Sequence, residues 1–116
     1  CHNHDGTGTG NKIAKAMASQ TDDWDDSSND TGAVGNNQAI NNFSGFNAFP
    51  EGSRYYADGD WHDLGKVAYF WSSTEAEGDI NKAYDRSLHY QKSNLITNSS
   101  RPKKNAFSVR FVKDLD

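Results

Sequence analysis

The stretch GKVAYFWSSTEAEGD, residues 65–79, decides how the rest of the sequence is interpreted. Its first part, Val67–Trp71, is the most apolar run of a polar chain, and hydroxyls and acids follow from Ser72 onward. A short apolar run bounded by turn residues is typical of a buried strand. We therefore expect Val67–Trp71 to be a central core strand that ends at Ser72 and Ser73, whose hydroxyls can bond backbone groups. Glu75–Asp79 would then open a loop at the border of a binding surface.

Other short apolar pieces follow in the chain, and several alternate with period two. Residues 83–90 and 107–112 alternate in this way, and SRYY precedes the turn at residues 57–60. Such alternation predicts half-buried antiparallel strands. The one helical signal is NKIAKAMAS, residues 11–19, which is short enough to be a strand instead. The pattern as a whole predicts a meander of short strands with little helix.

The composition limits the chain to one small domain. It has 116 residues, of which 34% are hydrophobic, and its mean hydropathy is -0.95. Three Trp, five Tyr and six Phe must therefore supply much of the core. We expect the glycine-rich residues 1–10 to be a flexible end and residues 11–116 to form the domain, with a long loop between residues 20 and 42.

The charge and the motifs exclude several classes of protein. A net charge of -4 argues against nucleic-acid binding, which needs a clustered basic surface. No apolar run approaches the ~18 residues of a transmembrane segment. The single cysteine, Cys1, cannot form an intrachain disulfide. No G-x-S-x-G is present, and GTGTGNK, residues 6–12, does not meet the phosphate-loop pattern. We expect no enzymatic activity and no cofactor other than calcium.

Calcium is considered because aspartates crowd TDDWDDSSND, residues 21–30. Hard oxygen donors at this density suit Ca²⁺. The EF-hand pattern is not met, since Thr31 stands where the tight turn requires glycine. A calcium site and a solvated acidic loop therefore both stay open. The candidate ligands are Asp22, Asp23, Asp25, Asp26 and Asp30.

Residues 55–92 are rich in side chains that form binding surfaces. Tyr and Trp give rigid contact area at low entropic cost, whereas Asp, Asn and Ser adapt their hydrogen bonds. We expect the aromatics at residues 69–71 in the core and those beside the Asp-Gly turn at residues 58–59 at the surface. The loops after Arg54 and Glu75 and the exposed face of residues 83–91 should build the site. The candidate binding residues are Tyr55, Tyr56, Asp58, Asp60, Trp61, His62, Asp63, Asp85, Arg86, His89 and Lys92.

Four ordered motifs resemble the Fibrobacter succinogenes major paralogous domain: SGFNAFPEGSR (44–54), AYFWSSTE (68–75), AYDRSLHY (83–90) and FSVRFVKD (107–114). The resemblance implies an α+β, C-type lectin-like fold, with short antiparallel strands, long irregular loops and little helix. The opening Trp-Arg-Leu-Pro-Thr segment of the family is missing, which implies that an N-terminal helix segment is absent. The lectin calcium motifs and the catalytic cysteine pair of the related formylglycine-generating enzymes are missing too.

The resemblance also implies a location and a role. Family members are secreted or surface proteins of bacteria, often lipoproteins, so we expect an extracellular or outer-surface location with a lipid anchor on the full-length protein. We expect a non-enzymatic ligand-binding or adhesion module of a bacterial or phage surface protein, which binds a glycan or a protein. A diversified receptor is one form of this hypothesis, because related domains serve diversity-generating retroelements. The alternative is a surface-fibre or appendage subunit that forms homo-oligomers through exposed aromatics.

Overall fold

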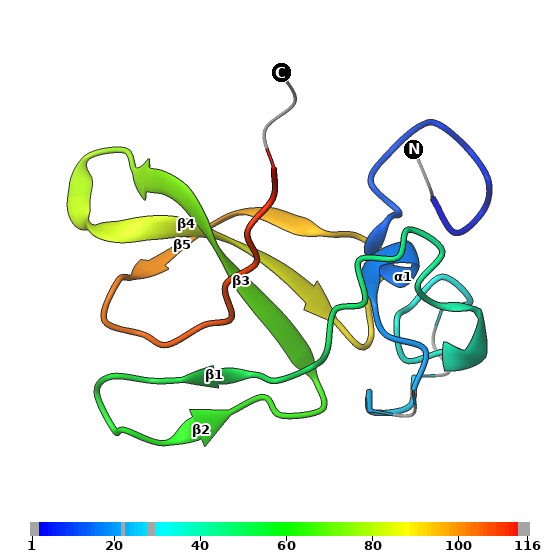
Figure 1. The fold of residues 1–116 in the computed structure, drawn as a ribbon, viewed down its shortest axis with the longest axis horizontal. Coiled ribbons are helices and arrows are strands. Elements are labelled where there is room, and N and C mark those ends of the chain that lie inside the picture. The colour runs from blue at the N-terminus through cyan, green and yellow to red at the C-terminus, as the bar shows by residue number, and fades with distance from the viewer. Residues whose placement is uncertain (1–2, 22, 28–29, 114–116) are drawn as a thin grey trace.

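The computed structural model describes residues 3–21, 23–27 and 30–113 (Figure 1). These residues form a mostly β structure with two small antiparallel sheets and almost no helix. In chain order the elements are α1 (Ala14–Met17), η1 (Gln38–Ile40), β1 (Ser53–Arg54), β2 (Trp61–His62), β3 (Val67–Ala76), β4 (Asp79–His89) and β5 (Ile96–Pro102).

The larger sheet has the strand order β3-β4-β5, and both pairs are antiparallel. β3 and β4 are the strands that the sequence predicts at residues 67–71 and 83–90. The prediction that residues 67–71 form the central strand is wrong, because β4 lies between β3 and β5. β5 was not predicted: ITNSSRP carries a single large apolar residue, Ile96, and ends in a proline, so it lacks the apolar alternation of a strand.

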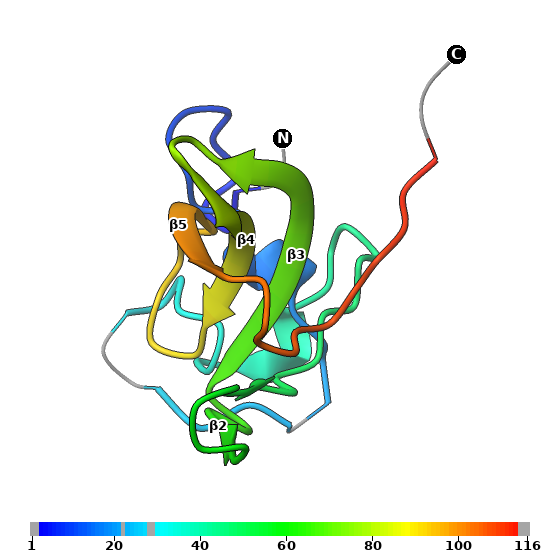
Figure 2. The same cartoon turned by 90° about the vertical axis from the view of Figure 1, so that its left-hand side faces the viewer.

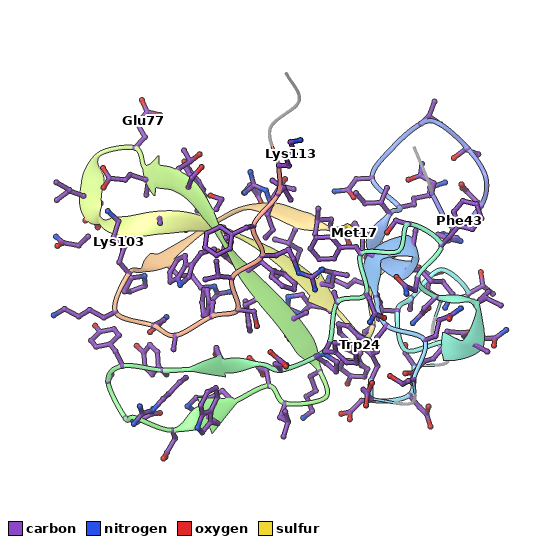
Figure 3. All side chains as sticks on the ribbon, viewed as in Figure 1. Met17, Trp24, Phe43, Glu77, Lys103 and Lys113 are labelled. Atoms are coloured by element: carbon purple, nitrogen blue, oxygen red, sulfur yellow. The ribbon has the colours of Figure 1, made fainter. Side chains whose placement is uncertain are left out.

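The polar half of the opening stretch does not form a loop. β3 continues through Ser72 and Ser73 to Ala76, and Glu77 and Gly78 form the turn into β4. This part of the hairpin projects from the body, and Figure 3 shows Glu77 at its outer tip, far from Trp24. The strand is polar here because water surrounds it. The predicted loop at residues 75–79 is therefore a tight turn.

A bulge marks the point where β3 leaves the body. Trp71 pairs with Asp85 and Glu75 with Ala83, so three residues of β3 lie opposite the single residue Tyr84. The Ser72 hydroxyl donates to the carbonyl oxygen of Tyr84 over 2.8 Å. The expectation that Ser72 bonds a backbone group is confirmed, although the bond spans a bulge within the strand.

The hydrophobic core lies on one face of the larger sheet, where irregular segments cover Ala68 and Leu88. Trp24 and Val34 hold down the long loop, and the Trp24 indole donates to the Ser19 hydroxyl over 3.1 Å. The remaining members of the buried cluster are Ala14, Ala18 and Ala48. The four-residue α1 is shorter than the segment from residue 11 to 19 in which the sequence predicts helical content.

A buried lysine also holds the long loop. Lys15 of α1 is 2% exposed, and its ammonium donates to the carbonyl oxygens of Ala33, Asn36 and Asn37. Burial lowers the pKa of Lys15. The sequence gives no signal for this role, since an isolated lysine beside alanines is typical of an exposed helix face.

The C-terminal segment, residues 103–113, joins the two sheets. Arg54 and Ala106 exchange two backbone hydrogen bonds of 3.0 Å, and the Ser108 amide donates to Tyr69 over 3.1 Å. Figure 1 shows this segment passing between the β1–β2 hairpin and the larger sheet. The predicted strand at residues 107–112 is wrong, because pairing stops at Ser108. Beyond it the chain runs outward, away from the body (Figure 2).

Residues 3–10 form a loop that closes on itself. The side-chain amide of Asn3 donates to the carbonyl oxygen of Thr9 over 2.8 Å, and the backbone amide of Lys12 donates to the side-chain oxygen of Asn3 over 3.0 Å. Lys12 also forms a 2.5 Å ion pair with Asp5. The flexibility expected for residues 1–10 stays a prediction.

Candidate functional site

A groove of about 520 Å³ lies between the β1–β2 hairpin and the larger sheet, which we call the hairpin groove. One wall is the hairpin and the residue that follows it, and the other is formed by the ends of β4 and β5 and by the C-terminal segment. Its lining comprises Ser53, Tyr55, His62, Asp63, Tyr69, Lys82, Ser100, Arg101, Pro102, Asn105 and Phe107.

Stacked aromatic rings form one side of the groove. The ring of Phe107 stacks on Tyr69, with centroids 4.8 Å apart, and on Trp71 at 4.4 Å. The guanidinium of Arg101 lies 5.1 Å from the centroid of the Tyr69 ring. These contacts form a rigid aromatic cluster next to a cation at the groove.

Tyr69 is also fixed by a polar contact. Its hydroxyl donates to the Asp63 carboxylate over 3.0 Å. Burial first, and then Asp63, raise the pKa of Tyr69 to about 12. Tyr69 therefore stays protonated at neutral pH and holds Asp63 in place, so that the other carboxylate oxygen is available as an acceptor.

The turn between β1 and β2 is held by Asp58. One carboxylate oxygen accepts the Asp60 amide over 2.9 Å, and the other lies 2.9 Å from Nε2 of His62. The Asp60 amide, with a smaller effect from His62, lowers the pKa of Asp58. The Tyr55 ring meets His62 edge to face at 6.2 Å. The turn thus presents an anionic carboxylate, an imidazole and a phenol in a fixed arrangement.

The predicted surface aromatics beside this turn are exposed. Tyr55 is 40% exposed, Tyr56 49% and Trp61 69%, and His62 is exposed as well. The prediction that Tyr69 is a core residue is confirmed, because it is buried, whereas Phe70 and Trp71 are half-buried.

The prediction for Asp85 is wrong. Asp85 was expected on an exposed strand face, but the structure buries it completely. The C-terminal segment covers this face of the sheet by stacking Phe107 on Tyr69 and Trp71. The Asp85 carboxylate lies 3.7 Å from Nε of Arg101. Burial raises the pKa of Asp85, and Arg101 opposes this effect.

Three polar groups in this buried region have no hydrogen-bond partner among the described residues. They are the two carboxylate oxygens of Asp85, the hydroxyl of Ser87 and Nε of Arg101. Buried polar groups are usually hydrogen-bonded, so an unpartnered group requires an explanation such as water or a ligand. Arg101 also lines the groove, while its Nε stays buried beside Asp85.

The structure brings together only part of the predicted site. Tyr55, His62 and Asp63 line the groove, while Tyr56 lines the adjoining hollow near Lys104. Trp61 lies with Ala106 and Ser108 in a different hollow and does not line the groove. Asp58 and Asp60 stay within the turn.

The other candidates lie elsewhere. Arg86 donates to the carbonyl oxygens of Asp85 and Thr97 and does not line the groove. His89 is half-buried with its ring 6.4 Å from Tyr69, and burial first, then Lys92, lower its pKa. Lys92 is exposed after β4.

Sequence reasoning missed Arg101, Lys82 and Phe107 as groove residues. Arg101 belongs to a strand that was not predicted, and Phe107 was assigned to a strand that does not form. The nearest sequence signal is the short basic run at residues 101–104.

The calcium candidates do not gather in the described part of the chain. Within it, no three His, Cys, Asp or Glu side chains lie together as a metal site would require. Asp23 accepts the Thr21 hydroxyl, and Asp30 accepts the Gly32 amide over 2.8 Å. Asp22 lies outside the described residues. The calcium site and the solvated acidic loop both stay open as predictions.

Fold and groove define the class of this chain: a small, mostly antiparallel β domain with an aromatic-lined groove between its two sheets. The chain belongs to the Fibrobacter succinogenes major domain family, whose model matches residues 2–113. The resemblance carried by the four motifs is thereby confirmed. Comparisons with curated proteins and with solved structures gave no match. Of the helices in the described residues, none has the length and apolar character to cross a bilayer.

Proposed function

We propose that this domain is a non-enzymatic ligand-binding or adhesion module of a bacterial or phage surface protein, and that the hairpin groove is its binding site. The observation that carries the proposal is the juxtaposition, in one concave site, of exposed Tyr55 and stacked Phe107 with the polar groups of His62, Asp63 and Arg101. Ligand sites typically combine apolar or aromatic walls with a few fixed polar groups.

The engagement of the groove side chains supports binding over catalysis. His62 is paired with Asp58, and the Tyr69 hydroxyl is bonded to Asp63. Among the described groove residues, no serine or lysine is hydrogen-bonded to His62, so the nucleophile and base of a covalent mechanism are not in contact. These groups are arranged to orient a ligand.

A C-type lectin-like fold and an extracellular location complete the proposal. Short antiparallel strands with long loops, held by buried side chains such as Trp24 and Lys15, agree with such a fold. The family membership supports the location, because the motifs resemble those of surface proteins. The ligand is then a glycan or a protein on another surface.

The test is binding by a glycan array and by pull-down with a groove variant, Tyr55→Ala with His62→Ala. Both side chains are exposed, so the fold should be retained. We expect at least a tenfold loss of affinity for any ligand found. The matched control is Trp61→Ala, which removes a more exposed aromatic outside the groove and should bind as the unmodified chain does. Unchanged binding by the groove variant would refute this site.

A diversified receptor is a narrower form of the same proposal. The positions that would vary are those that a ligand can reach, such as Tyr55, Asp60 and His62. Sequencing the locus from sister isolates tests it: clustered codon changes at these positions would support diversification, and uniform codons would exclude it.

A specific observation favours self-assembly as a second candidate function. In the C-terminal segment Val109 is 60% exposed, Phe111 92% and Val112 77%, beside a cavity of about 570 Å³ lined by Ile13, Met17, Phe46 and other residues. An exposed apolar edge of this kind favours pairing with another chain. The occupant would be the same segment of a second copy. Light scattering over a range of concentrations decides: large homopolymers that Phe111→Ser dissolves support assembly, and a concentration-independent monomer excludes it.

A further inference from the structure

Three cations border the hairpin groove and the hollow that adjoins it. Lys82 and Arg101 line the groove itself. Lys82 also lines the adjoining hollow, together with Lys104 and Tyr56. The ammonium of Lys104 lies 5.7 Å from the centroid of the Tyr56 ring. The cations therefore border one continuous surface that also carries exposed aromatic rings.

These cations are poorly neutralised by the chain itself. Lys82 is 3.5 Å from Asp79, and Arg101 is 3.7 Å from Asp85. Lys104 forms no ion pair with a carboxylate of the described residues. By contrast, Lys12 meets Asp5 at 2.5 Å. The Lys82–Asp79 pair is long and solvated on both sides, so it contributes little free energy. Lys82 and Lys104 therefore keep most of their capacity to bind an external anion, whereas Arg101 is shared with the buried Asp85.

Two further features favour a sugar as the carrier of the anionic group. Tyr55 and Tyr56 present half-exposed rings beside the cations, and such rings offer a flat apolar face for stacking. Asp63, which also lines the groove, supplies an acceptor for hydroxyl groups. A concave site of this size encloses a small ligand or a short length of a chain, whereas a folded protein partner presents a broad surface.

We propose that the hairpin groove binds an acidic glycan, whose carboxylate or sulfate meets Lys82, Arg101 and Lys104 while its ring packs on Tyr55 or Tyr56. This inference rests on the proposed function of the groove. The shared chemistry is an anionic group on a sugar ring, and the two sources of that group are distinguished by the probes below.

The experiment measures the affinity of the chain for four polymers by calorimetry at low and at raised salt concentration. Polygalacturonate carries carboxylates and dextran sulfate carries sulfates. Fully methyl-esterified polygalacturonate keeps the sugar and removes its charge, and poly-L-glutamate keeps carboxylates and removes the sugar. We expect one of the two acidic polysaccharides to bind at least tenfold more tightly than the esterified polymer and polyglutamate, with an affinity that falls at raised salt.

A charge-matched pair of variants locates the binding. Lys82→Gln with Lys104→Gln changes two exposed cations, one of the groove and one of the adjoining hollow, and should weaken binding about tenfold. The control, Lys92→Gln with Lys113→Gln, makes the same change of net charge at exposed positions outside the groove and should leave the affinity unchanged.

The outcomes separate this inference from the proposed function. Equal binding of the esterified polymer, of polyglutamate or by the Lys82 and Lys104 variant would overturn the acidic-glycan inference. Failure of both acidic polysaccharides to bind would overturn it too. In each case the proposed function is still tested separately, by whether the Tyr55→Ala, His62→Ala variant loses affinity for ligands found on the glycan array.

Discussion

At the scale of single residues, buried polar side chains hold the loops of this chain, a role that apolar side chains would fill in a more hydrophobic sequence. Lys15 donates to three carbonyl oxygens of the loop at residues 33–37. Asn41 donates to the carbonyl oxygens of Ser19 and Val34 over 2.9 Å and 3.2 Å. Such bonds satisfy loop backbone that would otherwise be buried without partners. They explain how a chain with 34% hydrophobic residues holds a long irregular loop.

Lys15 gives the first prediction. Lys15→Met keeps most of the side-chain volume and removes the donors, so the unfolding free energy should fall by about 2 to 4 kcal/mol. Urea denaturation measures this loss. Lys66→Met, at an exposed lysine, is the control and should lie within about 0.5 kcal/mol of the unmodified chain. Equal midpoints for the two variants would contradict the role of Lys15.

Asp85 gives a prediction of pH dependence. Because burial raises its folded pKa above 3.8, the folded chain keeps this proton to higher pH than the unfolded chain. Ionisation of Asp85 therefore costs stability as the pH rises from about 4 through the folded pKa. Asp85→Asn removes that cost. We expect the variant to be more stable than the unmodified chain at pH 7, with a difference that shrinks toward pH 3.

Denaturation at several pH values measures this difference, and the subtraction cancels the carboxylates that both chains share. A variant that is less stable at every pH by a constant amount would show that Asp85 is held by bonds that offset its burial.

At the scale of elements, strand periodicity succeeded where one face is buried and failed where it is not. In β4, Ala83, Asp85 and Ser87 are buried on the face opposite the core residue Leu88, while Tyr84 and Arg86 between them are half-buried, and the sequence alternates over the same residues. β5 pairs with β4 through backbone bonds while its side chains are largely polar, so it gave no signal. Residues 107–112 alternate, but only Ala106 and Ser108 find partners among the described strands. A sequence pattern does not report which backbone edge is free.

The β3–β4 turn provides an element-scale prediction. Gly78 has φ +80, and a Cβ added there would meet nothing within 4 Å, so backbone strain is the only cost of a side chain. Gly78→Ala should lower the unfolding free energy by about 1 to 2 kcal/mol. Gly8→Ala is the matched control, since Gly8 has equally open space and no positive φ. Thermal unfolding of both variants checks this, and equal melting temperatures would contradict the tight turn.

The C-terminal segment provides a second prediction at the scale of elements. Phe107→Ala removes the middle ring of the Tyr69–Phe107–Trp71 stack, and we expect a loss of about 2 kcal/mol because the ring is half-buried. The Arg54 amide, which bonds to Ala106, should exchange its hydrogen faster. Phe111→Ala is the control, since this ring is 92% exposed. Unchanged exchange at Arg54 after Phe107→Ala would contradict the attachment of the hairpin through this segment.

At the scale of the whole molecule, the core and the hairpin groove occupy different sides of the larger sheet. The sequence located the exposed half of the groove, because Tyr55 and His62 flank a recognisable Asp-Gly turn. It could not locate the other half, because Arg101 and Phe107 reach the groove only through the path of the C-terminal segment. That path depends on long-range backbone pairing, with Arg54 bonded to Ala106, and no local pattern encodes it.

The most direct test of the binding site is an amide chemical-shift titration of the chain with a ligand selected by the glycan array or by pull-down. We predict that the shifts concentrate at Tyr55, His62, Arg101 and Phe107, on both walls of the hairpin groove. Shifts confined to Met17, Phe46 and Phe111, beside the apolar cavity at the C-terminal segment, would contradict it.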